Sequence, residues 1–355
     1  TVLANQRSQR QSANMQGSAA TAPFNIRADE YEENRHFLLG QYFRLNYNKA
    51  LENLPIVQSN VQITRVEVWV TNRTGATTNT RDIVALMDLA EAAPFGIPGA
   101  PGGTPPASGL PYNTNGSLYT ILNNTPNARN SATATSALVG LGLQPVQDFE
   151  KTFARKLQPT DFTYNTQLGY ISLNQPLLPD EVLGVAFEYT YNGKRFQVGE
   201  FSQDIPPDSS GNSQKVLFLK MLKATSQRPG LPIWRLMMKN VYTVGYGSLQ
   251  REDFKLDVVY EQPSLGEKRY LPLKDTVAGI TPTVRDPYLG VPMLQLLRLD
   301  RLNNQNDPQP NGVFDYIEGI TVVSAQSRIV FPVLEPFGRD LEYAFKDGPS
   351  SNPDS

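Results

Sequence analysis

The sequence predicts a β-rich α+β fold, built of antiparallel sheets or sandwich-like units with a few helices. Three observations carry this prediction. Valines alternate with polar or aromatic residues in 66–70, which is the period-two pattern of a half-buried strand. Alternating aromatic and aliphatic residues flank Asn192 and Gly193, a dipeptide typical of a tight β-hairpin. A three- and four-residue apolar spacing follows Asp29 and indicates a helix.

The helix is the first expected element, and we predict it from Asp29 to Leu54. Its apolar stripe consists of Leu39, Tyr42, Phe43, Tyr47, Ala50, Leu51 and Leu54. Asp29 or Asn34 could cap its N-terminus, where the following glutamates suit the positive end of the helix dipole. Pro55 ends it.

Strands are expected next at 61–71 and 81–91, where apolar residues alternate. Residues 93–116 are rich in proline and glycine and predict a long exposed loop, because proline rings and glycine entropy both disfavour regular structure. Short helices are expected near 118–122 and 134–141.

The second half of the chain predicts mostly strands. Aromatic alternation places strands near 162–164 and 170–173, a hairpin at 184–201, an apolar strand at 216–222 and a further strand at 254–260. Residues 233–241 predict a helix or a mixed segment.

The expected organisation is a disordered segment at 1–23, a first α+β unit at 24–145, a second β-rich part at 146–346, and a disordered tail at 347–355. An aromatic pair, a short strand, a proline and an aliphatic pair recur in the same order after Phe162 and after Phe314. This pattern indicates two related β units, although any two β-hairpins can share it.

Composition excludes several classes of site. The chain has no cysteine, a single histidine at His36 and a net charge of −2. Cysteine-based metal or redox sites and a two-histidine metal site within this chain are therefore excluded, and a nucleic-acid footprint is not expected. No apolar run approaches the roughly 18 residues of a membrane-spanning helix. The start at Thr1, without a visible signal peptide, is what we expect of a processed chain or an excised fragment.

One loop could hold a cation, because oxygen-bearing side chains and a glycine are closely spaced in 300–315. The candidate calcium ligands are Asp300, Asn303, Asn306, Asp307, Asn311 and Asp315. The spacing differs from that of an EF-hand, and Asn and Asp also bond their own backbone in ordinary turns. We favour the structural turn.

Two carboxylate pairs could be read as an acid and a base, namely Asp180–Glu181 and Glu252–Asp253. Adjacent residues of a strand point to opposite faces, which is the wrong geometry for one cleft, so solvated turn acids are the better interpretation. We therefore predict no enzyme activity and no catalytic, cofactor or metal residues. Thr276 lies in Asp-Thr-Val, which resembles a short O-glycosylation acceptor motif of Bacteroidota periplasms.

Several longer motifs, found in order along nearly the whole chain, carry a family resemblance. They are ADEYEENRHFL at 28–38, QYFR at 41–44, ITRVEVWVTNRTG at 63–75, PDEVL at 179–183, EYTYNG at 188–193, QVGEFS at 197–202, LMMKNVY at 236–242 and RIVFPVLEPFG at 328–338. With these motifs the chain resembles the SprA/Sov family.

The resemblance implies the outer-membrane translocon of the type IX secretion system of Bacteroidota, which is also implicated in gliding motility. It implies as partners the rest of the translocon barrel, shuttle and plug proteins, and secreted cargo with a C-terminal signal. Charged residues such as Glu67 and Lys255 in the expected strands do not suit a lipid-facing wall. We therefore expect a soluble region that shapes or caps the pore, on the extracellular rather than the periplasmic side, with membrane contact only through the parent barrel.

Two other functions stay open. A cell-surface adhesin or glycan-binding module would explain the many aromatic residues, and glycan-array binding would favour it. An extracellular hydrolase would require turnover that is lost on substitution of Asp180 or Glu181.

Overall fold

The computed structural model describes residues 24–91, 112–113, 118–206, 215–252, 254–262, 266–270 and 290–347. The helices and strands of the first part are β1 (His36–Leu38), α1 (Gln41–Ala50), β2 (Val61–Thr71), β3 (Thr80–Leu86), α2 (Leu118–Asn124), α3 (Ala134–Gly140), β4 (Phe149–Lys156), β5 (Phe162–Asn165), β6 (Tyr170–Leu173), β7 (Leu183–Tyr191), β8 (Lys194–Val198) and β9 (Leu217–Lys223). Those that follow are η1 (Pro232–Leu236), β10 (Val241–Thr243), β11 (Tyr260–Gln262), β12 (Gly266–Lys268), α4 (Met293–Leu296), β13 (Val322–Val323), η3 (Ser324–Gln326), β14 (Arg328–Val330) and α5 (Arg339–Asp347).

The largest sheet closes on itself. Its strand order is β2-β4-β3-β9-β7-β8, and an additional pairing of β2 with β7 joins the ends of a ring of five strands, leaving β8 as an appended edge. β3 and β9 run parallel, whereas the other neighbours are antiparallel. Closure hides the unpaired edges of the five strands.

The interior of the ring is filled by side chains that alternate with those of the outer faces. One cluster joins Trp69, Ile83, Ala154, Ala186, Phe201, Leu217 and Leu219, so that every strand of the ring contributes to it. Gly184 also faces this cluster, because a Cβ placed there would lie 3.2 Å from the Leu219 side chain. The ring is therefore a packed core, as expected of a barrel with so few strands.

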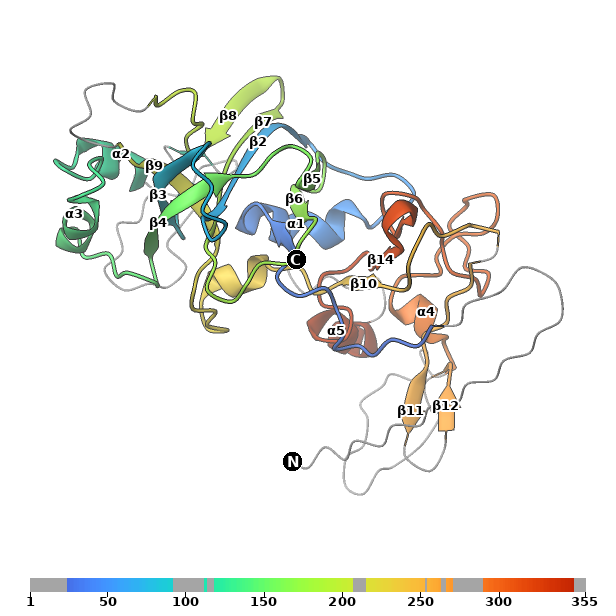
Figure 1. Cartoon of the computed structure of the whole chain (residues 1–355). Helices are drawn as coiled ribbons and strands as arrows, with labels where there is room; N and C mark the ends of the chain where they lie inside the picture. Colours follow the sequence, from blue (N-terminus) through green and yellow to red (C-terminus); the bar gives the residue numbers. More distant parts are fainter. Residues whose placement is uncertain are drawn as a thin grey trace.

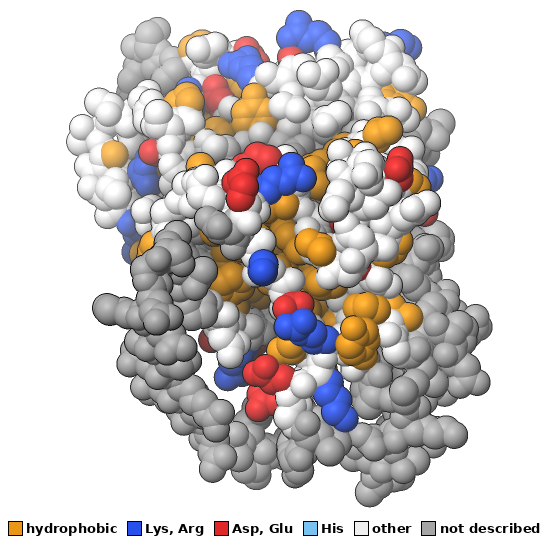
Figure 2. Space-filling view, turned by 90° about the vertical axis from the view of Figure 1, so that its right-hand side faces the viewer, with side chains coloured by type: hydrophobic (Ala, Val, Ile, Leu, Met, Phe, Trp, Pro, Cys, Tyr) orange, Lys and Arg blue, Asp and Glu red, His pale blue; other side chains and the backbone are white. Residues whose placement is uncertain are grey.

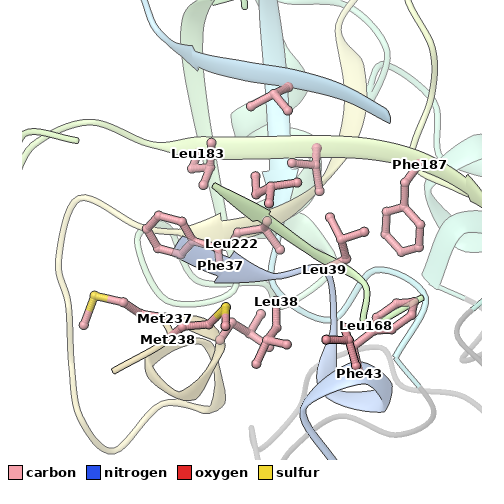
Figure 3. Packing of buried hydrophobic residues seen from close by; sticks show 14 of the residues in the cluster. Phe37, Leu38, Leu39, Phe43, Leu168, Leu183, Phe187, Leu222, Met237 and Met238 are labelled. Atoms are coloured by element: carbon pink, nitrogen blue, oxygen red, sulfur yellow. The ribbon is translucent and has the colours of Figure 1, made fainter. Parts of the chain in front are cut away.

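Two cores cover the outside of the ring. On one side α2 and α3 pack on β3, β4 and β9 through a cluster that includes Leu122, Leu138 and Phe149. On the other side α1 and the three-stranded sheet β1-β6-β5 pack on β2 and β7, with Phe37, Leu39 and Phe187 among the buried residues (Figure 3). Burial of these apolar surfaces is the main stabilising term of the fold.

The last third of the chain adds a further small sheet, of order β10-β14-β13, with α4 and α5 beside it (Figure 1). Its core joins Tyr242, Leu299, Phe314 and Phe331. This part is tied to α1 by polar contacts. The buried Asn240 side chain donates to the hydroxyl of Tyr47 at 3.2 Å and to the carbonyl of Phe331 at 2.7 Å.

The predicted fold class is confirmed, and so are several elements. The strand expected at 61–71 has these bounds as β2, and the two short helices expected after the proline-rich loop are α2 and α3. The hairpin at Asn192-Gly193 joins β7 to β8, with φ of +49° and +76° at the two turn residues. These positive angles are what a two-residue hairpin turn needs.

The long helix expected from Asp29 is wrong in its first part. The helix begins at Gln41, and His36–Leu38 form strand β1 instead. All three residues of β1 are buried and pair with β6, a pattern that suits a strand covered on both faces rather than one helical stripe. Gly40 is in an extended conformation (φ 178°, ψ 174°) directly before the helix.

Three other elements are shorter than expected. The strand predicted at 81–91 is β3, which ends at Leu86. The strand predicted at 254–260 is confined to Tyr260–Gln262, while Leu256 and Val258 pack against the last core without a strand ladder. The segment at 233–241, predicted as helix or mixed structure, contains most of the 3₁₀ helix η1, which ends at Leu236. Strand β10 then begins at Val241, the last residue of that segment.

The predicted disordered segment 1–23, most of the loop 93–116 and residues 348–355 lie outside the described residues, as does Thr276. The division near residue 145 stays a prediction, although the large sheet takes strands from both sides of it. The two related β units also stay a prediction. Phe162 begins a strand paired with β6, whereas Phe314 lies in a segment without a strand.

Candidate functional site

The two aspartates that frame the candidate calcium loop hold its backbone. The Asp300 side chain is buried and accepts the backbone N–H groups of Asn311 and Gly312, each at 2.9 Å. Asp315 accepts the backbone N–H of Arg301 at 2.6 Å and that of Leu302 at 3.2 Å. Burial raises the pKa of Asp315 to about 6, because its carboxyl group is removed from water.

The tip of this loop is an Asx-type turn. The side-chain oxygen of Asn303 accepts the backbone N–H groups of Gln305 and Asp307 at 2.8 and 2.9 Å. Asn306 has a φ of +66°. Across the described ranges, His, Asp and Glu side chains do not gather in threes in a way that could hold a metal ion. The contacts support the structural turn.

Of the two carboxylate pairs, Asp180 and Glu252 lie in turns, and Glu181 directly follows one. Asp180 is exposed and forms an ion pair with Arg73, whereas Glu181 is buried and accepts the backbone N–H of Leu178 at 2.8 Å. Glu252 is exposed, and Asp253 lies outside the described residues. The two side chains of the first pair have different surroundings and different partners.

A charged cluster that the sequence did not predict lies where the two halves of the chain meet. The first half is the part up to the end of β9 at Lys223, and the second half is the part that follows it. At its centre is Glu32, whose side chain is 9% exposed. Its carboxylate forms an ion pair with Arg328 at 3.0 Å and with Arg35 at 3.2 Å, and it accepts a hydrogen bond from the hydroxyl of Thr243. His36 completes the cluster, with Nε2 lying 2.6 Å from Oε2 of Glu32.

The electrostatics of the cluster favour an ionised Glu32 beside a neutral His36. Burial opposes ionisation of Glu32, but hydrogen bonds from His36 and Thr243 and the charge of Arg328 outweigh it and lower its pKa to about 2. Burial lowers the pKa of His36, and this effect exceeds the opposite effect of Glu32. His36 can therefore donate from Nε2 to Glu32 and accept from the hydroxyl of Ser172, 2.8 Å from Nδ1.

Ser172, His36 and Glu32 are hydrogen-bonded in series, which is the order of groups that activates a serine in hydrolases. Here His36 is only 2% exposed and lies directly opposite Ser172 in the pairing of β1 with β6. Ser172 and His36 thus connect neighbouring strands, and neither side chain lines the cleft that Glu32 borders. We interpret it as a structural network that joins β1, β6, β10 and β14.

Two buried lysines of β9 also bind charged or backbone groups of neighbouring segments. The ammonium group of Lys220 lies 2.5 Å from Glu91 and donates to the carbonyl of Met87. That of Lys223 donates to the carbonyls of Leu178, Pro179 and Glu181 at 2.8–3.0 Å. Burial lowers the pKa of Lys223 to about 8.

The surface is mixed in charge. On the face beside α4, hydrophobic side chains cross the middle and basic and acidic groups are interspersed among them (Figure 2). In the part of the chain that the structure describes, no helix is both long and apolar enough to cross a membrane.

These features define a β-rich region with a closed sheet and several cores around it. The buried charged side chains described above bind backbone groups or pair with each other, and so connect its segments. The chain belongs to the SprA_N family, whose model is described as motility related/secretion protein and matches residues 1–178. The predicted family is thereby confirmed, while the motifs quoted after residue 178 lie beyond the matched range. No curated protein matches the chain.

Sequence reasoning missed the Glu32 cluster for a physical reason. Its members come from segments separated by as many as 296 positions, and charged residues at such distances show no common spacing. One signal was available, because the single histidine of the chain stands in the glutamate-rich segment at 30–36.

Proposed function

We propose that this region is a non-catalytic part of the outer-membrane translocon of the type IX secretion system, where it shapes or caps the pore used by folded cargo. The observation that carries the proposal is the match to a family described as motility related and secretory. The motifs at 28–44 and 63–75 resemble the SprA/Sov family. This resemblance supports the assignment to the type IX system, with its partners and its link to gliding motility.

The architecture supports a mechanical role. Strands from 36 to 223 build the closed ring and the sheet beside it, and the Glu32 cluster connects them to β10 and β14. A ring with a filled interior and several cores around it deforms little, since close-packed interiors have low compressibility. Such a body can hold a pore open or restrict it without any chemical step.

The extracellular position predicts that the hairpin joining β7 and β8 can be reached from outside the cell. Asn192 and Gly193 are exposed at its tip, and among the described residues no heavy atom outside Gly193 and its two chain neighbours lies within 4 Å of a Cβ built on Gly193. We expect a protease recognition site inserted between them in the parent protein to be cleaved on intact cells. The fragments are detected by immunoblotting.

The control is the same insertion in cells with a permeabilised outer membrane, where both sides are accessible. Cleavage that occurs only after permeabilisation would place the region on the periplasmic side and contradict the proposal that it caps the pore from outside the cell. A normal level of exported cargo with the insertion in place would show that the hairpin tolerates it.

A further inference from the structure

A shallow, open cleft of about 490 Å³ lies above the Glu32 cluster. Its wall takes residues from distant parts of the chain, including Arg35, Asn174, Thr243, Gln326 and Arg328. The network that joins the two halves of the chain therefore also forms the floor of a concave surface.

One aromatic ring stands at the rim of this cleft. Tyr246 also lines it, is 105% exposed, and lies between Gly245 and Gly247. The turn that carries the ring is held on both sides. The N–H of Val244 donates to the carbonyl of Ser327 at 2.8 Å, and the Ser327 hydroxyl donates to the carbonyl of Gly247 at 2.5 Å. The ring is thus presented to solvent from an anchored turn.

The charged groups of the cleft are oriented by each other. Glu32 binds both Arg35 and Arg328, Arg35 donates to the carbonyls of Leu173 and Asn174, and Arg328 donates to the side chain of Gln326. Two guanidinium groups share one carboxylate, so the lining keeps a net charge of +1, but both groups already donate to Glu32 and to neighbouring carbonyl or amide oxygens, and no charged ligand is needed to hold them in place. It offers planar groups whose donors and acceptors stand at fixed spacings.

These features fit one ligand class. A sugar ring has a face of C–H groups that packs on a flat aromatic ring and a rim of hydroxyls that both donate and accept hydrogen bonds. Phosphate or carboxylate would need guanidinium groups that are not already bound to Glu32 and to carbonyls. A peptide would need a free strand edge or apolar pockets, whereas Tyr246 and Ala325 are the apolar side chains of this lining.

We propose that this cleft binds a neutral oligosaccharide, with one sugar ring stacked on Tyr246 and its hydroxyls bound by the amide of Gln326 and the neighbouring polar groups. The site goes beyond the role in export and does not depend on it. A neutral glycan held beside the junction of the two halves would stabilise that junction in the folded state.

The test uses the full chain on an array of neutral and uronic-acid-containing oligosaccharides, followed by isothermal titration with the neutral sugar that gives the strongest signal. We expect Tyr246→Ala to weaken binding at least about tenfold, since loss of an aromatic stacking platform has effects of this order. Tyr246→Phe should keep most of the affinity, because it keeps the ring. Gln326→Ala should weaken binding without loss of the platform.

Tyr270→Ala is the matched control, as Tyr270 is 52% exposed and does not line the cleft. Thermal melting without sugar should be the same for the three tyrosine variants, which excludes unfolding as the cause of their effects. Gln326→Ala removes an acceptor of Arg328, so its binding is measured at a temperature where melting shows it to be folded. Absence of binding to any neutral sugar, binding to acidic sugars alone, or equal loss in Tyr246→Ala and Tyr270→Ala would each overturn the proposal.

Discussion

Replacement of Gly169 by alanine is expected to destabilise the fold by about 3 kcal/mol, from roughly 1–2 kcal/mol of backbone strain and 1–3 kcal/mol of overpacking. Gly169 has a φ of +63°, and a Cβ at this position would lie 2.0 Å from Cδ1 of Phe43. No contact of that length between carbon atoms is tolerated, so the turn before β6 or the ring of Phe43 must move. Equilibrium urea unfolding of the full chain measures the change.

The chain contains a matched control for this substitution. Gly75 has a φ of +68°, but no heavy atom of the described residues, apart from Gly75 and its two chain neighbours, lies within 4 Å of a Cβ built on it. Gly75→Ala should therefore cost about 1–2 kcal/mol, which is the backbone strain alone. Combining Gly169→Ala with Phe43→Ala should cost less than the sum of the single changes, because the clash is then absent. Equal effects of the two glycine substitutions would contradict the packing at Phe43.

Glu32→Gln is expected to cost about 3–5 kcal/mol, since it leaves Arg328 buried without its counter-charge. The side chains of Glu32 and Arg328 are 9% and 7% exposed, so the few water contacts open to Arg328 from the cleft replace the lost carboxylate only in part. Asp29→Asn is the control, because the pair of Asp29 with Arg27 is largely exposed and should change stability by less than about 1 kcal/mol.

The same cluster predicts how stability depends on pH. The pKa of Glu32 is lowered from 4.5 to about 2 in the folded state, so its stabilisation is complete above about pH 4.5 and is lost as the pH falls towards 2. The lowered pKa of His36 acts in the same direction, beginning below its ordinary value of 6.5. Urea midpoints from pH 7 to pH 3 should fall less steeply for Glu32→Gln than for the natural chain. Parallel curves would show that Glu32 is not ionised in a buried network.

The strands and turns that could be predicted share a local cause. β2 and the β7–β8 hairpin are specified by alternation and by Asn192-Gly193, which act over a few neighbouring residues. Closure of the ring could not be predicted, because the pairing of β2 with β7 joins segments more than a hundred residues apart. Local periodicity predicts helix at His36–Leu38, because it does not reveal that tertiary packing buries these three residues of β1 on both faces.

The features of the candidate site likewise include some that local sequence predicts and some that it does not. The turn at Asn303 could be predicted, because the side chains of Asn and Asp bond to backbone groups a few residues away. The Glu32 cluster and the cleft above it could not be predicted, because only the folded chain brings Arg328 to Glu32 and places Tyr246 in the lining of the same cleft. A local pattern indicates which residues are polar, and only the topology decides which of them meet.

The central claim is that the packed fold of this region is what cargo export requires, and the most direct measurement is the amount of cargo on the cell surface. Cells carrying Gly169→Ala in the parent protein are compared with cells carrying Gly75→Ala, with surface cargo expressed per amount of parent protein in the membrane. We expect export to fall at least about tenfold in the first strain and to stay near the natural level in the second. Undiminished export from Gly169→Ala cells, when the same substitution destabilises the isolated chain by about 3 kcal/mol, would contradict a role of this packed fold in export.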